Sequence, residues 1–404
     1  MNILFLTMVS GMNRIEVSGI YTDLMRRFRD EGHEVYIIYP QERRSGFPTG
    51  MHVMNHVHSL GVKTLNVTQT NVVEKGIGQI LLEFQFRSAL KRYFVEVNFD
   101  LILYSTPPIT FTRVIKYVKK SNSHAVSYLL LKDIFPQNAV DIGMLTTSGL
   151  KGLIYKSFRR KEKELYRVSD FIGCMSPANV RYIQEHNPEI NPDVVEIAPN
   201  SYDVPLTRVK TDRLEVRKKY NLPMDKPIFI YGGNMGKPQG IPFLVECLQA
   251  VKDREDCHFV MVGDGTDYYK IETWVKEAKP KAISLFRHLP KADYDALVSA
   301  CDVGMIFLDY RFTIPNYPSR LLSYLIERKP IIAVTDPNCD VGTIAEENEY
   351  GFWCPSNSVD IFVETVDKIL ASDVERMGKN GYEFYLNNYT VEHTYQAVIK
   401  HLIR

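Results

Sequence analysis

Short apolar runs alternate with helical stretches along the whole chain. Residues Asn2–Val9 predict a buried strand, Ile20–Asp30 carries apolar side chains at helical spacing, and Val35–Tyr39 predicts a second strand. This order predicts a βαβ unit, in which ligands bind beside the carboxyl ends of the parallel strands. The polar segment Ser10–Gly19 is therefore a candidate ligand loop, although an ordinary connection would read the same way.

The same alternation continues to the end of the chain. Further strands are expected at Leu101–Tyr104, Ala125–Leu131, Phe171–Met175, Ile228–Tyr231, His258–Val262, Ile283–Phe286, Val303–Phe307 and Ile331–Val334. Periodicity breaks over Ala198–Pro205, which we interpret as an interdomain hinge. The pattern predicts two doubly wound α/β domains, residues 1–200 and 206–383, and a C-terminal helix within 384–404 that can pack back on the first domain.

Composition narrows the class of protein only a little. The 404 residues are 45% hydrophobic and 24% charged with a net charge of +1, so nothing global indicates a nucleic-acid partner. Six cysteines without a C-x-x-C pair favour buried thiols in a reducing compartment. The N-terminus lacks a basic signal-peptide region and no apolar run reaches 18 residues. We therefore expect a cytoplasmic protein.

The segment Pro227–Val245 holds the strongest candidate chemistry. A buried strand runs directly into a turn containing Gly232 and Gly233, and a helix then begins near Pro242. The free N–H groups of such a helix favour a phosphate, and Lys237 would add a full charge. Because the G-x-G-x-x-G fingerprint is absent, a nicotinamide enzyme is disfavoured. A tight structural turn is the alternative.

Two patterns that could indicate a metal are better explained otherwise. The histidines near His52, His56 and His58 lack the acidic partner of a zinc helix and lie in β-prone, loop-like sequence, the irregular stretch Gln41–Val73. The D-x-D at Asp293 begins a helix, where aspartates serve as caps. We expect no metal and no cofactor.

Basic residues concentrate on two helices expected in the first half, Ile77–Phe94 and Leu150–Arg167. The half that ends at Tyr202 has a net charge of +5, and the second helix carries the run Arg159-Arg160-Lys161. Basic amphipathic helices can lie on an anionic membrane surface, while a solvated domain face is the default interpretation. Peripheral contact with the inner face of the cell membrane is one interpretation of this pattern.

Several segments together resemble bacterial family 4 retaining glycosyltransferases, especially those that build surface polysaccharides. The segments are the opening NILFLTMV…SGIYTDLMRRFRDEGHEVYIIYP, then LKDIFPQNAVDIGML, PNSYD, YGGNMGKPQGIPFLVE, FVMVGDG, FRHLPKADYDALVSACDVGM and PSRLLSYLIERKPIIAV. The resemblance covers nearly the whole chain. It implies the GT-B fold, which is α/β with two Rossmann-like doubly wound domains facing a cleft, the first binding the acceptor and the second the nucleotide-sugar donor.

The resemblance also implies donor-binding residues. The family holds the donor diphosphate with an arginine and a lysine, whose columns contain Asn234 and Gln239 here, so Lys237 is expected to take over this contact. The remaining implied donor contacts are Ser18 and Gly19 in the first domain, Gly233 in the turn, and His288 and Leu289 at the nucleotide base.

The chain departs most from the family at its paired-glutamate motif. Pro315 and Ser323 occupy those columns, and neither can act as a carboxylate. Asn316, Ser319 and Arg320 nearby keep a polar helix start, so N–H groups, hydroxyls and a guanidinium can still bind a donor. Glu327 lies one turn beyond Ser323 and is not a simple substitute.

The resulting hypothesis is a metal-independent, retaining glycosyltransferase. It would move a sugar from a nucleotide-diphosphate donor, expected to be a UDP-sugar, to a glycan or lipid-linked acceptor. Lys237 and Arg320 would stabilise the leaving diphosphate, while Lys132 and Asp133, which follow a strand of the first domain, would face the reacting centre. Two alternatives stay open: a nucleotide-sugar 2-epimerase of the same fold, and a non-catalytic nucleotide-sugar-binding subunit.

Overall fold

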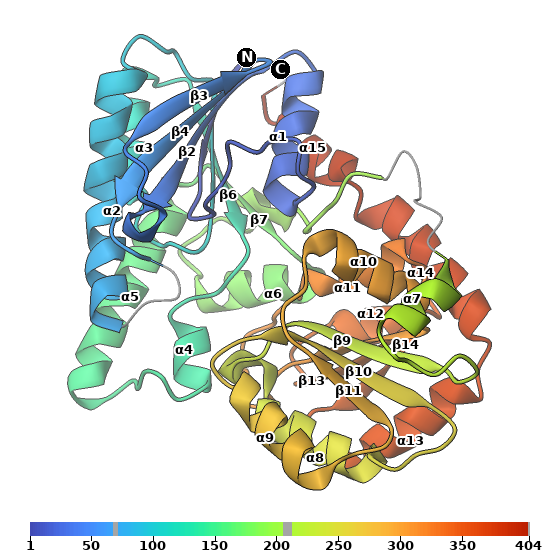
Figure 1. Ribbon diagram of the computed structural model, residues 1–404. Helices are drawn as coiled ribbons and strands as arrows, with labels where there is room; N and C mark the ends of the chain where they lie inside the picture. The colour runs from blue at the N-terminus through green and yellow to red at the C-terminus, as the bar shows by residue number, and fades with distance from the viewer. Residues whose placement is uncertain (68–71, 205–211, 403–404) are drawn as a thin grey trace. The chain divides into compact units, whose positions relative to one another are not determined.

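The computed structural model of this chain describes residues 1–67, 72–204 and 212–402. The chain forms two compact units (Figure 1). Unit 1 contains Met1–Asp203 together with Tyr389–Arg404, and unit 2 contains Val204–Asn388. The chain therefore leaves unit 1 after Asp203 and returns to it at Tyr389. Pro205, at the end of the predicted hinge, lies outside the described residues.

Unit 1 is built on an eight-stranded sheet in the order β3-β4-β2-β1-β5-β6-β7-β8, parallel except for β3. The strands are β1 (Asn2–Leu6), β2 (Glu34–Glu42), β3 (Gly50–Met54), β4 (Val57–Thr64), β5 (Leu101–Ser105), β6 (Val126–Leu131), β7 (Phe171–Cys174) and β8 (Val195–Ile197). Strand β5 is buried at every position, as expected where helices cover both faces of a parallel sheet.

Helices cover the two faces of this sheet (Figure 1). They are α1 (Ile20–Asp30), α2 (Val72–Tyr93), α3 (Thr112–Ser121), α4 (Gln137–Asp141), α5 (Gly149–Val168), α6 (Pro177–His186) and α15 (Val391–Ile399), with short 3-10 turns at Arg43–Ser45 and Pro192–Val194. Helix α15 packs beside α1, and its Val398 joins Leu24 and Phe28 in the core of unit 1. The end of the chain thus completes the first hydrophobic core.

The expectation that the stretch Gln41–Val73 is irregular is wrong. It contains the antiparallel pair of β3 and β4, and β4 also pairs in parallel with β2. His56 and His58 both bond to the carboxylate of Glu34, at 2.6 and 3.1 Å. The hairpin was missed because β3 has only five residues and is almost entirely exposed, which gives a weak signal in the sequence.

Unit 2 has a six-stranded, fully parallel sheet in the order β11-β10-β9-β12-β13-β14. Its strands are β9 (Ile228–Asn234), β10 (His258–Asp264), β11 (Ile283–Phe286), β12 (Val303–Phe307), β13 (Ile331–Thr335) and β14 (Gly351–Pro355). The strand order reverses between β9 and β12, and this is where a doubly wound fold binds its ligand.

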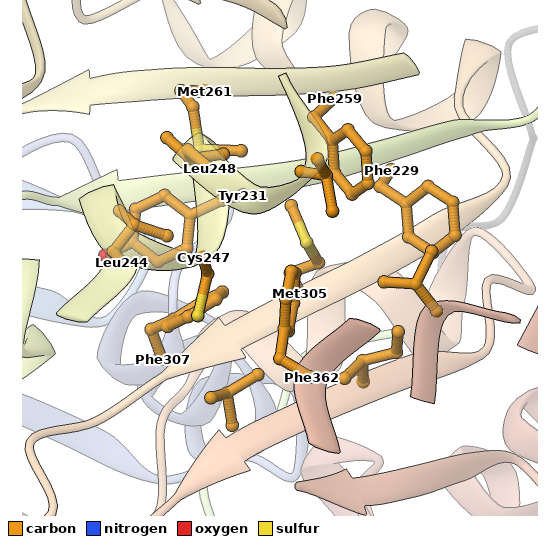
Figure 2. Close-up of a cluster of buried hydrophobic side chains, with 14 of the residues drawn as sticks. Phe229, Tyr231, Leu244, Cys247, Leu248, Phe259, Met261, Met305, Phe307 and Phe362 are labelled. Carbon is orange, nitrogen blue, oxygen red and sulfur yellow. The ribbon is translucent and has the colours of Figure 1, made fainter. Parts of the chain in front are cut away.

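The helices of unit 2 flank this sheet. They are α7 (Arg213–Lys219), α8 (Ile241–Val251), α9 (Tyr268–Ala278), α10 (Lys291–Ala300), α11 (Arg320–Ile326), α12 (Val341–Glu347), α13 (Val359–Leu370) and α14 (Val374–Asn388), with a 3-10 turn at Lys237–Gln239. Figure 2 shows the core between the sheet and its helices, where Phe229 and Phe259 stack at 4.9 Å and Leu244 and Phe362 are fully buried. This packing fixes the strand ends that carry the site.

Candidate functional site

The turn after β9 is closed by its own side chains. Asn234 Nδ2 donates to Gln239 Oε1 at 2.7 Å, and the same oxygen accepts from the backbone N–H of Gly236 at 3.3 Å. Gly233 has φ +126, a conformation that favours glycine. The two positions where the resemblance expects cations thus hold an amide pair that fixes the shape of the turn.

Arg320 supplies a cation beside this turn from another element. It follows the loop after β12, which pairs with β9, and its guanidinium carbon lies 4.7 Å from the ring centroid of Tyr231. A Cβ added to Gly233 would come within 3.3 Å of that same carbon. Arg320 Nη1 is buried and has no hydrogen-bond partner among the described residues. A half-buried, always charged guanidinium with one buried nitrogen that lacks a partner is suited to an anionic ligand.

Two other tyrosines hold the backbone at the reversal of strand order. The Tyr324 hydroxyl accepts from Gly232 N and lies 3.2 Å from the carbonyl oxygens of Ile230 and Met305. The Tyr294 hydroxyl would be 2.0 Å from a Cβ at Gly232. Gly232 is therefore required by close packing, and the tyrosines position the turn against which Arg320 lies.

The other predicted residues of unit 2 occupy different positions. Lys237 is exposed, and within the described ranges its ammonium makes no ion pair. His288 is exposed and Leu289 half-buried after the edge strand β11. Ser319 is exposed and precedes α11, and Ser323 lies inside that helix. Of the donor-binding residues predicted in unit 2, the structure therefore brings Gly233 and Arg320 close to each other.

A second group of buried polar atoms follows β12 and β13. Asn316 O accepts from the Cys339 thiol at 3.0 Å, and Cys339 N donates to Asp336 Oδ1, also at 3.0 Å. Asp336 Oδ2 and Asn316 Nδ2 are buried without a partner among the described residues. Burial raises the pKa of Asp336 to about 7. This carboxyl therefore holds a proton more readily than an ordinary aspartate.

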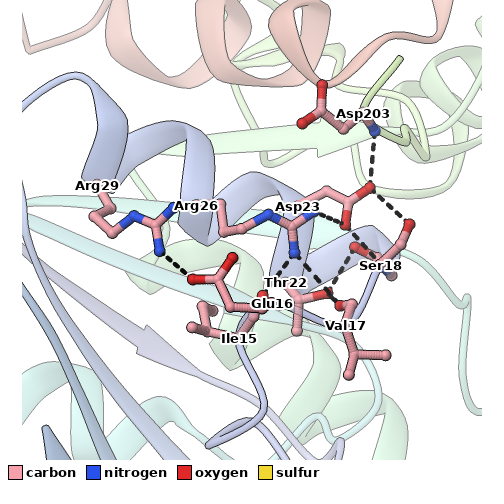
Figure 3. Close-up of polar contacts among 10 residues, drawn as sticks. Ile15, Glu16, Val17, Ser18, Thr22, Asp23, Arg26, Arg29 and Asp203 are labelled. Carbon is pink, nitrogen blue, oxygen red and sulfur yellow. Dashed lines mark hydrogen bonds and ion pairs between the residues drawn. The ribbon is translucent and has the colours of Figure 1, made fainter. Parts of the chain in front are cut away.

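In unit 1 the predicted ligand loop is tied to one buried carboxylate (Figure 3). Asp23 Oδ1 accepts from Gly19 N at 2.8 Å and Arg26 Nη2 at 2.6 Å, and Oδ2 accepts from Ser18 Oγ at 3.2 Å and Asp203 N at 2.8 Å. Asp23 is completely buried. Ser18 and Gly19 thus already use these polar groups in holding the loop to α1, and the same carboxylate also holds the backbone of Asp203.

Lys132 and Asp133 also have partners inside unit 1. Lys132 Nζ donates to the carbonyl oxygens of Ala198 and Pro199 at 3.0 and 3.1 Å, and burial lowers the pKa of Lys132 to about 7. Asp133 Oδ1 accepts from Asn138 Nδ2 at 2.7 Å. Lys132 thus supports the backbone at Ala198 and Pro199, and Asp133 is bonded to a side chain of α4.

The D-x-D pair has structural partners. Asp293 pairs with Lys219 at 2.7 Å and Asp295 with Lys291 at 2.8 Å. Asp293 lies in the first turn of α10, whose N-cap is Pro290, so the expected cap is corrected to an ion pair. Within residues 1–67, 72–204 and 212–402, no group of three His, Cys, Asp or Glu side chains could hold a metal ion.

Tyr231, Tyr294 and Asp336 were not expected from the sequence. Tyr231 ends the buried run directly before the double glycine, and an aromatic ring at that point is a signal that could have been noticed. Asp336 follows β13 as Asp133 follows β6, but nothing local shows that it is buried.

Comparison with solved structures gives the class of the fold. Sucrose-phosphate synthase from Thermosynechococcus elongatus is similar with a TM-score of 0.76 at 16% identity, covering 99% of this chain and 98% of that one. HepE from Anabaena, solved in complex with UDP and glucose, is similar with a TM-score of 0.69 at 13% identity, covering 100% and 99%. With its two Rossmann-like domains, the chain has the GT-B fold of glycosyltransferases.

Sequence comparison then gives a family match for the second unit. Residues 212–384 match the family described as "Glycosyl transferases group 1", so unit 2 carries a domain of that family. The "Probable glycosyltransferase WbjE" of Pseudomonas aeruginosa is 24% identical over 317 residues, which is 77% of this chain and 75% of that protein. The chain is therefore a glycosyltransferase.

A shorter match concerns a second relative. WcaI of Escherichia coli (strain K12), which carries the provisional name of a colanic acid biosynthesis glycosyl transferase, is 30% identical over 89 residues, covering 22% of this chain and 21% of that protein. Both relatives are thus named as glycosyltransferases. No helix within the described residues is both long and apolar enough to cross a membrane.

Proposed function

We propose that this protein is a retaining glycosyltransferase of bacterial cell-surface polysaccharide synthesis. Its donor would be a UDP-sugar and its acceptor a glycan or lipid-linked glycan, used in the cytoplasm at the inner face of the membrane. Support for UDP comes from HepE, which was solved with UDP and glucose, and support for a polysaccharide product comes from the name of WcaI. Retention is implied by the family resemblance.

The observation that carries the proposal is the placement of Arg320. Its guanidinium stacks on Tyr231 and lies against Gly233, with Nη1 unpaired. A phosphate oxygen beside Gly233 would satisfy this donor, and a planar guanidinium can bind two oxygens of a diphosphate at once. Helix α8, which begins at Ile241 after the turn, would add backbone N–H groups.

This arrangement replaces the cations that are missing from the turn. Asn234 and Gln239 shape the loop, Arg320 supplies the fixed charge, and the exposed Lys237 supplies a second, mobile charge. Negative charge grows on the leaving nucleoside diphosphate as the glycosidic bond breaks, and prearranged donors stabilise it most in the transition state. No carboxylate is needed at Pro315 or Ser323 for this step.

Donor binding by Arg320 variants tests the proposal. Loss of a charge-assisted hydrogen bond costs about 1.5–3 kcal/mol, so Arg320→Ala should weaken UDP binding in calorimetry roughly 10- to 150-fold. The matched control is Arg311→Ala, because Arg311 lies in the loop that leads to Arg320 but is exposed and paired with Asp309 at 2.8 Å. Unchanged UDP affinity in Arg320→Ala would overturn the assignment of the diphosphate site.

Product analysis separates the three activities that share this fold. A transferase must release one UDP for each new glycosidic bond, with the donor's anomeric configuration kept. A 2-epimerase would convert the sugar without an acceptor, and a binding subunit would release no UDP. Either of these last results would reject the proposed function even if Arg320 binds the donor.

A further inference from the structure

The start of α5 exposes an apolar face in unit 1. Leu150, Leu153 and Ile154, which we call the α5 apolar face, are 83%, 64% and 48% exposed. Their spacing of three and four residues places them on one side of the helix. Met144, in the loop before α5, is 53% exposed. Several large apolar side chains in one short segment therefore lie in contact with solvent.

The opposite side of the same turns is anchored to unit 1. The Tyr155 hydroxyl donates to Gln137 Oε1 at 3.1 Å, and Phe158 packs edge-on against Phe135 with ring centroids 5.0 Å apart. Gly152 is so close to the loop that an added Cβ would be 2.7 Å from the backbone of Thr147. The helix start is held by these contacts, and they direct the α5 apolar face outward.

The charge around this face has one sign. Residues 142–161 contain five Lys or Arg residues and no Asp or Glu. Lys151 and Lys156 are exposed and form no ion pair within the described ranges, whereas Arg159 pairs with Glu162 and Arg160 with Glu164. The predicted membrane-binding run Arg159-Arg160-Lys161 is thus partly neutralised, and the unpaired Lys151 and Lys156 lie nearer the helix start.

An apolar face flanked by unpaired lysines fits an anionic bilayer better than a second copy of this chain. A symmetric contact between two copies would bring Lys151 and Lys156 against the same lysines, which is unfavourable. At a bilayer, leucine and isoleucine enter the boundary of the acyl chains while lysine side chains reach lipid phosphates.

We propose that the α5 apolar face, with Lys151 and Lys156, docks unit 1 on an anionic lipid surface. The contact gives the proposed transferase access to a lipid-linked acceptor. Only this role of the contact rests on the proposed function. The docking itself requires only the described side of unit 1, so it can be measured without donor, acceptor or turnover.

Vesicle co-sedimentation of the full chain tests the docking. The probes are vesicles of phosphatidylcholine with phosphatidylglycerol and vesicles of phosphatidylcholine alone, at about 50 mM and 500 mM salt. We expect binding to the anionic vesicles at low salt, and a loss of about 10-fold or more in the triple variant L150S/L153S/I154S. Lys151→Gln and Lys156→Gln should each lose about 5-fold.

Control variants show whether a loss of vesicle binding is specific to the α5 apolar face. Leu214→Ser removes a leucine that is 58% exposed on α7 of unit 2 and should bind vesicles like the wild type. Arg320→Ala should also bind vesicles normally, and the triple variant should keep its UDP affinity, so failure of the docking and failure of the proposed function are distinguishable.

Three results would overturn the docking. They are absence of wild-type binding to anionic vesicles, equal binding to neutral vesicles, and wild-type binding by the triple variant. Light scattering that shows a dimer lost in the triple variant, without vesicle binding, would instead assign this face to contact between copies.

Discussion

The loops that follow the first strands of the two sheets differ in how their polar groups are used. In unit 1, the loop after β1 directs Ser18 and Gly19 to Asp23, which also accepts from Arg26 and Asp203 (Figure 3). In unit 2, the turn after β9 closes on itself, and the neighbouring Arg320 keeps an unpaired nitrogen.

This difference distinguishes polar residues that hold the fold together from polar residues that are available to a ligand. Buried polar groups are almost always paired, so a fully paired cluster such as that of Asp23 is explained by folding alone. The Arg320 guanidinium is half-buried beside the glycine turn, and its buried Nη1 has no partner among the described residues, so folding alone does not explain it and it is the donor contact that we propose. The resemblance gave both loops a donor contact, and the hydrogen bonds favour unit 2.

The same contrast between paired and unpaired buried atoms holds for two carboxylates, those of Asp23 and Asp336. Both side chains are fully buried, but both oxygens of Asp23 have partners, whereas Asp336 Oδ2 has none among the described residues. Variants of each residue therefore test whether the pairing has the energetic consequences that we assign to it.

The largest effect is expected from Asp23→Ala. Removing one partner of a buried charge network costs about 3–5 kcal/mol, because Arg26 and the backbone N–H groups lose their acceptor. Calorimetry should show a lower melting temperature for unit 1. The control is Asp30→Ala on the same helix, because Asp30 forms an exposed pair with Arg29 and should change little. Equal melting of both variants would contradict the supporting role of Asp23.

Asp336 should make the stability of unit 2 depend on pH. Its folded pKa of about 7 lies above its ordinary value of 3.8, so the folded state keeps the proton longer than the unfolded state. Stability from this group is complete below pH 4 and is lost as pH rises through 7, by up to ~4 kcal/mol at 1.36 kcal/mol per pKa unit.

Asp336→Asn supplies the matched variant. The amide oxygen can still accept from Asn338 N and Cys339 N, but it carries no charge at any of these pH values. Urea unfolding between pH 4 and pH 8 should therefore show a flatter profile for the variant than for the wild type. Parallel profiles for the two proteins would mean that the carboxyl titrates normally.

Gly233→Ala should weaken UDP binding about 10-fold, because it strains a backbone at φ +126 and crowds Arg320. Gly46→Ala is the control, since Gly46 has φ +74 and open space around its Cβ position. That substitution adds backbone strain in unit 1 without touching the site. Calorimetric titration measures the UDP affinity of both variants. Equal affinities would mean that the glycine turn beside Arg320 does not take part in UDP binding.

Gln239→Ala should weaken UDP binding about 5-fold, because Gln239 Oε1 accepts the two hydrogen bonds that shape the turn. Asn234→Ala removes one of these bonds from its other end. The double variant should therefore lose little more than Gln239→Ala alone, as a double-mutant cycle will show. Full additivity of the two losses would mean that the amide pair is not a unit.

Lys237→Ala is expected to have the smallest effect, about 2- to 3-fold on UDP affinity. The lysine is exposed, so its attraction to a diphosphate is screened by water and salt. Raising the salt concentration should erase the difference between this variant and the wild type. A loss larger than that of Arg320→Ala would return the main diphosphate contact to the turn itself.

The sequence by itself determined the succession of strands and helices. Apolar runs such as Ile228–Tyr231 and Val303–Phe307 are local signals that need no knowledge of neighbours, and both became central strands. The short edge strand β8 and the last strand β14 were missed, because weak runs become strands only when a neighbour offers hydrogen bonds. The same pattern predicted two doubly wound α/β domains, and the family resemblance, carried by motifs in order, added the GT-B fold.

Only the tertiary structure decided which polar groups are engaged. Lys132 and Ser18 look available in the sequence, yet their partners Ala198, Pro199 and Asp23 are set by folding. Arg320 meets Tyr231 because β9 and β12 are adjacent in the sheet although distant along the chain. Hydrogen bonding depends on distances of about 3 Å, and such distances between remote residues are fixed only when the chain has packed.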